Sequence, residues 1–404
     1  MLDILALVQV SAAIIGISPF VFFWIRMKKY SKRPLEIPRE SVDFPSLTIV
    51  VPVWNEEMVL SAKLDDLVKQ DYPKDRMEIL VIDSHSSDST MEIFSHWKSI
   101  QSPELNVRSI QMPSHRGKSA AINRLLMEPL NTDVFVITDA DALLAPGALK
   151  RIGRWFSDQR IGAVCGTQKI LGNSNSEHFV NEKTYRSFYH DLRIGESAIS
   201  SSPIFEGSLA AYRNSLVLGQ QIDQTYNADD SQLAILINRN GSRSIMDPEL
   251  HFFEYLPSTS DAAKKRRLRR ANGLVHLFSR NPTSSISTID RKFTMILRME
   301  SWAHLRMPFF VLISIAFMLC HMSYSIYSVA MDIFPQPVHT SLLFIDLLLL
   351  IMLLLGNNFR MGRILRAFVD AQWTLLVANI GMYMGVDFRI WEQDIESRES
   401  LIEE

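Results

Sequence analysis

The feature that most constrains the fold is a regular alternation of short apolar runs with helical patterns, beginning near residue 47. Alternation of this kind predicts an α/β domain in which a mostly parallel sheet is covered by helices on both faces. The expected strands are Leu47–Val53, Glu78–Ile82, Val107–Met112, Val134–Ile137 and Ile161–Gly166, and the helices between them are Glu57–Lys69, Ser89–Lys98, Lys118–Met127 and Pro146–Trp155.

The pattern continues less regularly up to about residue 290 and ends in a change of composition. A long amphipathic helix is expected, then further short elements that alternate between strand and helix. These are the helix Glu177–Ser197, the strand Gly207–Tyr212, the helix Asp230–Asn238 and two short strands, Ser244–Met246 and Phe252–Tyr255.

The first 33 residues predict a membrane anchor. Ile4–Ile25 is nearly uncharged and long enough to cross a bilayer, and a basic cluster follows it directly at Arg26–Arg33. A cleavable signal would carry its positive charge before the apolar run, so we expect the anchor to be retained. The positive-inside rule then places the following residues in the cytoplasm. A buried core helix is the alternative interpretation of this run.

The last third of the chain predicts further contact with a membrane. Phe293–Met307 mixes apolar and charged residues as an interfacial helix does, and Pro308–Ala330 and Ser341–Leu355 are long apolar runs. Ile364–Val386 could span the bilayer or lie in its plane, and we favour the second. Three domains are therefore expected: an anchor (1–33), a catalytic α/β domain (34–290) and an interfacial and transmembrane part with a tail (291–404).

Net charge and cysteine content bear on the partners and the compartment of the protein. The net charge is −2, so charge gives no indication of a nucleic-acid partner. There are two cysteines, Cys165 and Cys320, one in an expected strand and one in an apolar run. Pairing is therefore not expected, and a reducing, cytoplasmic environment fits the α/β domain.

Two carboxylates follow the apolar strand Val134–Ile137, at Asp139 and Asp141. Side chains alternate along a strand, so these two point the same way where the strand meets its loop. Ligands of open α/β sheets bind outside the carboxyl ends of strands, and paired carboxylates there suit Mg²⁺ or Mn²⁺. Aspartates are also common in plain turns, which is the alternative.

Other strand ends carry polar residues that are candidates for binding a nucleotide. Pro52, Asn55 and Glu57 follow the first strand, although Asn and Glu at a helix start also act as caps. Asp83 ends the second strand, where an acidic residue can bind a ribose or base edge. Lys118 follows His115-Arg116-Gly117 at a helix start, which suits a phosphate but is also frequent by chance.

These motifs together resemble the family 2 glycosyltransferases with the GT-A fold, and the apolar runs resemble the membrane-bound branch that includes cellulose and hyaluronan synthases. The resemblance rests on Val-Pro-Val-Trp-Asn-Glu-Glu from residue 51, the strand that ends in Asp83, Arg-Gly-Lys-x-x-Ala-x-Asn from residue 116 and Thr-Asp-Ala-Asp from residue 138. Their order matches over residues 45–280. A GT-A fold, which is Rossmann-like, and a divalent metal cofactor, Mn²⁺ or Mg²⁺, are thereby expected.

The resemblance implies a role for each matching position. Asp230 would be the general base, with Asp229 beside it in place of the family's glutamate. Arg269 would stabilise the leaving diphosphate, Gly207 and Glu206 would contact the acceptor, and the metal would be bound by Asp141 and Asp139. The donor would be bound by Pro52, Asn55, Glu57, Asp83, Lys118, Asp139 and Arg267.

Several of these positions have simpler interpretations. Gly207 could be an ordinary turn, and Asp230 could cap the helix that follows it. The basic cluster Lys264–Arg270 could bind anionic lipid rather than the diphosphate. In this cluster Arg266 and Arg270 replace the glutamine and tryptophan of the processive branch, which argues against synthesis of a long polymer.

The expected function is a membrane-anchored, inverting, metal-dependent transfer of a sugar from a nucleotide diphosphate donor, with UDP-sugars considered first. The acceptor would be a lipid or lipid-linked glycan at the cytoplasmic face of the cell membrane, and no nucleic acid is involved. A processive polysaccharide synthase is one alternative. A non-catalytic nucleotide-sugar-binding membrane protein is another. The oligomeric state is left open.

Overall fold

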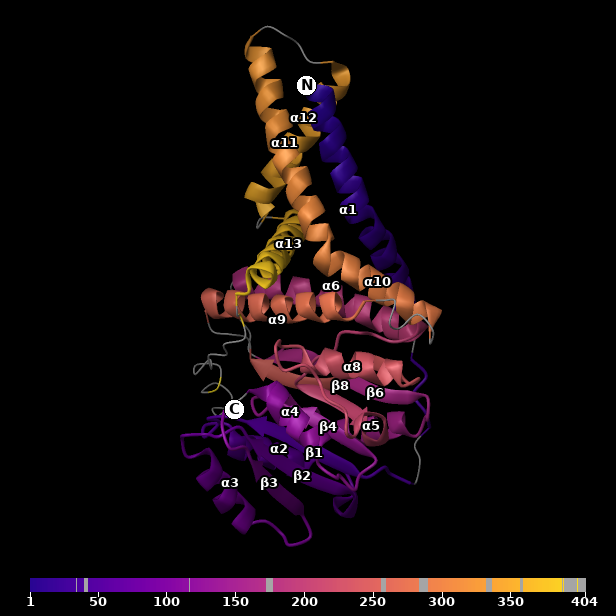
Figure 1. The fold of residues 1–404 in the computed structure, drawn as a ribbon, viewed down its shortest axis with the longest axis vertical. Coiled ribbons are helices and arrows are strands. Elements are labelled where there is room, and N and C mark those ends of the chain that lie inside the picture. Colours follow the sequence, from indigo (N-terminus) through magenta and orange to yellow (C-terminus); the bar gives the residue numbers. More distant parts are fainter. Residues whose placement is uncertain are drawn as a thin grey trace.

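The computed structural model describes residues 1–33, 35–39, 43–115, 117–171, 177–255, 259–282, 290–331, 336–356, 359–386, 388 and 398. Side chains are not described for residues 177–185, 187 and 260. Arg116, named in the motif above, lies outside the described residues. Figure 1 shows three levels: an α/β domain, a layer of helices that cross above it, and three long helices that rise from this layer.

The α/β domain is built on one eight-stranded sheet with the strand order β3-β2-β1-β4-β7-β6-β8-β5. Strands β1, β2, β3 and β4 are parallel, as the sequence predicts. The strands are β1 (Leu47–Val53), β2 (Met77–Asp83), β3 (Asn106–Gln111), β4 (Val134–Thr138), β5 (Leu143–Leu144), β6 (Ile161–Leu171), β7 (Leu209–Arg213) and β8 (Arg243–Tyr255).

One strand runs against the others in the middle of the sheet. β7 is antiparallel to β4 and to β6, while β8 runs parallel to β6. The first residue of β7 therefore lies beside the last residue of β4, and Leu209 pairs with Thr138. The end of β8 reaches the same edge of the sheet as the end of β4. This arrangement brings three segments that are distant in sequence to one edge.

Helices cover both faces of the sheet, as predicted. On one face α2 (Leu60–Lys69), α3 (Thr90–Ser99) and α5 (Ala148–Phe156) bury their apolar sides against the strands. On the other face α4 (Lys118–Leu126) and α8 (Asp229–Arg239) do the same. Two separate apolar clusters result, one on each face, so burial of apolar area holds the sheet from both sides.

Two local predictions differ from the structure. The strands expected at Ser244–Met246 and Phe252–Tyr255 are parts of one strand, β8, whose pairing with β6 changes register between Cys165 and Thr167. Helix α2 begins at Leu60 rather than Glu57. The backbone N–H groups of Glu56 and Glu57 donate to Thr90 and Asp88 across the neighbouring loop, which holds this segment out of the helix.

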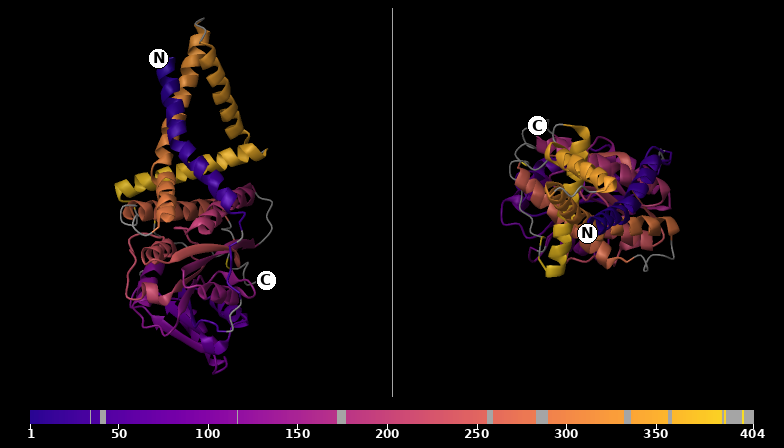
Figure 2. Two further views of the ribbon diagram at one scale, coloured as in Figure 1. Left: turned by 90° about the vertical axis from the view of Figure 1, so that its right-hand side faces the viewer. Right: turned by 90° about the horizontal axis from the view of Figure 1, so that it is seen from above.

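A layer of amphipathic helices lies above the sheet: α6 (Glu177–Ile199), α9 (Ser260–Arg280), α10 (Arg291–Leu305) and α13 (Arg360–Met384). The left view of Figure 2 shows α13 lying across the rising helices rather than along them. A position of α13 in the plane of a membrane, which the sequence favours, stays a prediction. A short helix, α7 (Asn214–Val217), follows β7.

The three rising helices are α1 (Leu2–Tyr30), α11 (Met307–Ala330) and α12 (Pro337–Leu354), and each is apolar and long enough to cross a membrane. The 24 residues of α11 would measure about 36 Å, against a bilayer core of about 30 Å. Polar groups join the helices inside this apolar bundle. Asp346 of α12 accepts a hydrogen bond from Gln9 of α1 at 2.6 Å and lies 3.3 Å from His321 of α11.

Candidate active site

Three carboxylates converge at the carboxyl edge of the sheet. Asp139 and Asp141 follow β4, and Glu254 lies near the end of β8; one oxygen from each lies within 4.8 Å of the others. An all-oxygen, anionic set of this kind suits Mg²⁺ or Mn²⁺. The donor set therefore fits the metal that the sequence predicts. Glu254 was not predicted, because it becomes a neighbour of Asp139 only when β8 pairs beside β6.

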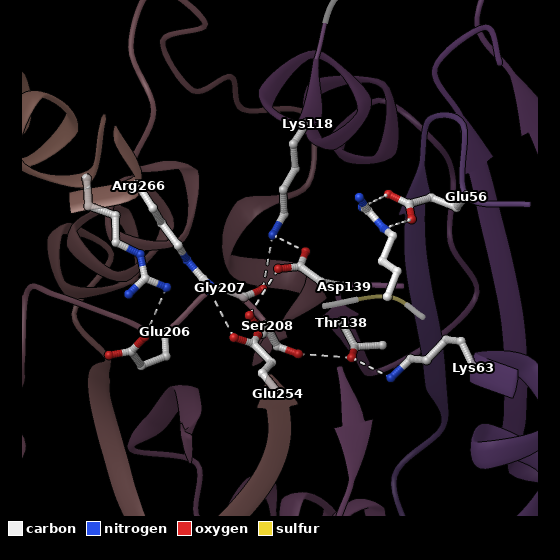
Figure 3. Close-up of polar contacts among 12 residues, drawn as sticks. Glu56, Lys63, Lys118, Thr138, Asp139, Glu206, Gly207, Ser208, Glu254 and Arg266 are labelled. Atoms are coloured by element: carbon white, nitrogen blue, oxygen red, sulfur yellow. Dashed lines mark hydrogen bonds and ion pairs between the residues drawn. The ribbon is translucent and has the colours of Figure 1, made fainter. Parts of the chain in front are cut away.

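The two aspartates of this cluster differ in their surroundings. Burial raises the pKa of Asp139, but the Lys118 ammonium, 2.5 Å away, and the Ser208 hydroxyl, 3.0 Å away, together hold it below the usual value. Burial and the charges of Glu254 and Asp139 raise the pKa of Asp141. Figure 3 shows Lys118 and Ser208 directed at Asp139. Asp141 is thus the carboxylate with the greater need of a cation.

A buried lysine holds the segment that carries these aspartates. Lys63 of α2 is fully buried, and its ammonium donates to Thr138 Oγ1 at 2.8 Å and to the carbonyl of Ala142. These two bonds lie on either side of Asp139 and Asp141. Burial lowers the pKa of Lys63, while Asp66, 3.7 Å away, raises it. Lys63, on α2, therefore holds in place the segment that carries Asp139 and Asp141.

Gly207 separates the Lys118–Asp139 pair from a second carboxylate, Asp230. A Cβ on Gly207 would lie 3.1 Å from Asp230 Oδ2 and 3.3 Å from Lys118 Nζ. The carbonyl of Gly207 accepts a hydrogen bond from Lys118 at 3.1 Å. A side chain at this position would therefore crowd both charged groups.

Asp230 has the protonation properties of a base that operates near neutral pH. Burial and the neighbouring Asp229 raise its pKa to about 7. Its Oδ1 accepts a hydrogen bond from the backbone N–H of Ser231 at 2.7 Å, so it also stabilises the first turn of α8. The preceding residue, Ala228, has a φ of 148°, a strained conformation for a residue with a side chain. The N-cap of α8 is Ala228, so Asp230 is not the cap that the sequence allowed as an alternative.

Arginines line the side of the site that faces the helical layer. Burial and the charges of Arg266 and Arg270 lower the pKa of Arg269 to about 10, while Asp139 and Asp229 raise it. Arg266 donates to Glu254 at 2.9 Å, and Arg270 lies 3.9 Å from Glu206. Positive charge therefore gathers between the acidic cluster and the helical layer.

Glu206 is surrounded by this positive charge. Burial raises its pKa, but the charges of Arg270, Arg193, Arg186 and Arg266 hold it below the usual value. Positive charge from four arginines thus surrounds Glu206, although Arg266 is also paired with Glu254.

The loops after β1 and β2 are joined to each other by side chains that were predicted to bind the donor. Asn55 adopts a left-handed backbone conformation, with a φ of 54°, and its Oδ1 accepts from the N–H of Ser87 at 2.8 Å. Glu57 accepts from the N–H of Ser89 at 3.0 Å. Asp83 is buried and accepts from the N–H and hydroxyl of Ser86. These side chains shape the loops, whatever else they bind.

Most of the predicted site residues lie at one edge of the sheet, and their roles stay predictions. Pro52 pairs with Ile82 on β2, beyond the last residue of β1 that pairs with β4. Arg267 lies on α9, but no contact among the described residues joins it to the carboxylates of the site. Four residues of the site were not predicted from the sequence: Glu254, Lys63, Ser208 and Glu56. Ser208 and Glu56 nevertheless lie within motifs that the sequence indicated, beside Gly207 and Asn55.

A family model described as glycosyltransferase like family 2 matches residues 45–273. Among curated proteins, the chain is 28% identical to the "Probable glycosyltransferase YdaM" of Bacillus subtilis over 236 residues, which are 57% of this chain and 56% of the relative. It is 32% identical to the beta-monoglucosyldiacylglycerol synthase of Synechocystis over 133 residues, which are 33% of this chain and 27% of the relative. The chain thus spans about half or less of the length of these relatives.

A solved structure matches over nearly the whole chain. It is the mannosyltransferase PcManGT from Pyrobaculum calidifontis in complex with GDP-Man and Mn²⁺. The TM-score is 0.75 at 26% sequence identity, and the match covers 95% of this chain and 100% of that one. The likeness therefore includes the helical layer and the rising helices as well as the α/β domain.

Proposed function

Since the chain belongs to the glycosyltransferase family 2-like proteins, we propose that it is a membrane-anchored, inverting enzyme that transfers a hexose from a nucleoside diphosphate donor to a lipid or lipid-linked acceptor. The catalytic domain faces the cytoplasm. Asp139, Asp141 and Glu254 would hold Mn²⁺ or Mg²⁺, which would supply positive charge to the donor diphosphate.

The observation that carries this proposal is the arrangement of charged groups around Gly207. Lys118 with Asp139, next to the proposed metal site, and Asp230 all lie close to this residue. A single displacement needs the acceptor hydroxyl and its base on the side of the sugar opposite to the leaving diphosphate. We therefore assign the diphosphate to the side of Lys118 and Asp139 and the acceptor hydroxyl to the side of Asp230.

Each residue then has a defined task. Asp230 accepts the proton of the acceptor hydroxyl as the new glycosidic bond forms and the bond to the diphosphate breaks. Lys118 and Arg269 supply positive charge to the diphosphate as it leaves. The configuration at the anomeric carbon is inverted, because one displacement occurs and no covalent enzyme intermediate forms.

The acceptor is proposed to be a lipid because of the position of the site. The helical layer of α9, α10 and α13 lies directly above the catalytic domain, and the three apolar helices rise from it. The matched relative in Synechocystis is named as a glycolipid synthase. The arginines around Glu206 favour an acceptor that carries an anionic group near the reacting hydroxyl.

The donor is proposed to be a UDP- or GDP-hexose. UDP-sugars were the first expectation from the sequence, and the solved structure that matches 95% of the chain contains GDP-Man with Mn²⁺. Both classes therefore belong in the first assay.

The test is release of nucleoside diphosphate by the full-length protein in lipid nanodiscs, across UDP- and GDP-hexoses, with Mn²⁺, Mg²⁺ or a chelator. We expect one donor to be hydrolysed or transferred, chelator to abolish this, and Asp141→Asn to reduce it by about 10²-fold or more. Asp75→Asn, an exposed aspartate distant in sequence from the acidic cluster, serves as the control.

The product distinguishes the alternatives. A product that carries one added sugar, with inverted anomeric configuration by NMR, supports the proposal. A ladder of long products would replace it with a processive synthase. Nucleotide-sugar binding without turnover in the presence of bacterial and archaeal lipid extracts would favour the non-catalytic alternative.

A further inference from the structure

A buried glutamate lies at the donor side of the site, in the loop after β1. Glu56 is 3% exposed, and its backbone N–H donates to Thr90 Oγ1 at 2.8 Å. A carboxylate buried to this extent is costly unless a positive group pairs with it. Burial raises the pKa of Glu56 to about 8, and the charges of Asp141 and Asp139 contribute to the rise. The acidic cluster is thus close enough to repel it.

The partner of Glu56 comes from the other end of the chain. Arg398 Nε donates to Glu56 Oε2 at 3.0 Å, and Arg398 Nη2 donates to Glu56 Oε1 at 2.8 Å. This is a bidentate pair between residues 342 positions apart, and both side chains are at most 4% exposed. Two parallel charge-assisted bonds fix the orientation of the carboxylate as well as its charge.

The pair borders the proposed metal site. The charge of Arg398 lowers the pKa of Asp141, while Asp141 in turn raises that of Glu56. Figure 3 shows Glu56, with its ion pair, on the opposite side of Asp139 from Arg266 and Glu206. Without Arg398 the pKa of Glu56 would rise further, because Arg398 lowers it, and the carboxyl would lose the two bonds that orient it beside the proposed donor site.

Glu56 also belongs to a loop whose shape is set by side-chain contacts. Its neighbour Asn55 has a left-handed backbone and bonds to Ser87, and Glu57 bonds to Ser89. Movement of the Glu56 carboxylate would therefore move the loop that follows β1, at the edge where the nucleotide is proposed to bind.

We propose that Arg398 is a positioning residue of the donor site. By fixing the orientation of the Glu56 carboxyl through two parallel bonds, it holds the loop of residues 54–57 in the form that binds the nucleoside diphosphate. The donor site is then incomplete in the α/β domain alone, because the C-terminal part of the chain supplies one of its charges. This inference rests on the proposed function, since it requires a nucleoside diphosphate at this edge.

The test measures nucleotide affinity by calorimetry on the full-length protein, with GDP and with UDP, each in the presence of Mn²⁺. We expect Arg398→Ala to weaken binding of the preferred nucleotide by about tenfold or more, equal to about 1.4 kcal/mol. Arg398→Lys keeps a positive charge but loses the two parallel donors of the guanidinium group. Its nucleotide affinity should therefore lie between those of the wild type and Arg398→Ala. Arg160→Ala, which removes an arginine from an exposed pair with Asp158, should leave the affinity unchanged.

Two further measurements distinguish a positioning role of Arg398 in the donor site from a contribution to the stability of the fold alone. Free guanidinium ion at a non-denaturing concentration should restore nucleotide affinity to Arg398→Ala and have no such effect on Arg160→Ala. In a Glu56→Gln background, Arg398→Ala should change the affinity by less than about twofold, because the bidentate pair is already lost in that background. If Arg398→Ala does not fold, the nucleotide affinities of Arg398→Lys and Glu56→Gln are compared with that of the wild type instead.

The outcomes are distinct. Failure of the wild-type protein to bind either nucleotide overturns the proposed function and this inference with it. Wild-type binding with equal affinity in Arg398→Ala, even if the melting temperature falls, overturns the inference alone. Tighter binding in Arg398→Ala also overturns it, since Arg398 would then oppose the donor.

Discussion

At the scale of single residues, the site depends on how closely groups of opposite charge are held. Asp139 lies 2.5 Å from Lys118, whereas the raised pKa of Asp141 is due to its burial and to the charges of Glu254 and Asp139. The spacing of the two aspartates predicted that both face one edge. The opposite directions in which their pKa values shift could not be predicted, because Lys118 and Glu254 come from α4 and β8.

The pH dependence of turnover tests the role of Asp230. Burial and Asp229 raise its pKa to about 7, and a base works only when ionised. Activity should therefore rise with pH, by about tenfold per unit below pH 7, and level off above it. Asp229→Asn removes a negative neighbour, lowers the pKa of Asp230 and should shift the profile to lower pH. Asp230→Asn should lose turnover but retain nucleotide binding. A flat profile between about pH 6 and 8 would contradict this assignment.

Gly207 provides a second test. An alanine there would place its Cβ 3.1 Å from Asp230 and 3.3 Å from Lys118. We expect Gly207→Ala to reduce kcat by about 10²-fold, since small misplacement of reacting groups has costs of this size. Circular dichroism and the melting temperature should change little, because the backbone of Gly207 is not among those with positive φ. Normal turnover in this variant would show that the placement of Asp230 and Lys118 around Gly207 is not needed for the reaction.

At the scale of elements, the direction of one strand assembles the site. β7 runs against β4, so Gly207 and Ser208 arrive beside Asp139. The alternation of strands and helices predicted the parallel half of the sheet correctly. It could not predict the reversed strand, since apolar patterning reports burial of a strand and not its direction.

The contact between α1 and α6 offers a test at this scale. Gly195 of α6 crosses α1 so closely that a Cβ would lie 2.1 Å from the carbonyl oxygen of Met27. Gly195→Ala should therefore force the two helices apart and destabilise the protein by about 1–3 kcal/mol. Thermal unfolding in detergent measures this. Ala198→Gly, three residues on in the same helix, is the control, with an expected cost of about 1 kcal/mol from helix propensity alone. Equal melting temperatures for Gly195→Ala and wild type would show that the helices do not meet this closely.

At the scale of the whole molecule, the chain combines an α/β enzyme domain with a helical part that lies on one side of it (Figure 2). The N-terminus lies at the far end of the rising helices, and the C-terminal part returns to the catalytic domain through the Arg398–Glu56 pair. The helices that are apolar and long enough to cross a membrane are therefore confined to one side of the α/β domain, which suits the proposed lipid acceptor and a water-soluble donor that approach from opposite directions.

The proposed orientation in the membrane can be measured by cysteine labelling. In a variant with Cys320 replaced by serine, a cysteine at Val338, 63% exposed at the start of α12, should react with an impermeant maleimide on intact cells. A cysteine at Ser102, in an exposed loop of the catalytic domain, should react only after the membrane is made permeable. Labelling of Ser102→Cys on intact cells would place the catalytic domain outside and overturn the proposal.

By itself the sequence determined the family, the α/β alternation, the apolar helices and the carboxylates at the ends of strands, because burial and local turn chemistry are recorded in the order of residues. Only the tertiary structure decided which of these meet. Glu254 joins Asp139 and Asp141 through the pairing of β6 and β8, and Arg398 reaches Glu56 across 342 positions. Such contacts depend on strand order and helix crossing, for which no local pattern exists.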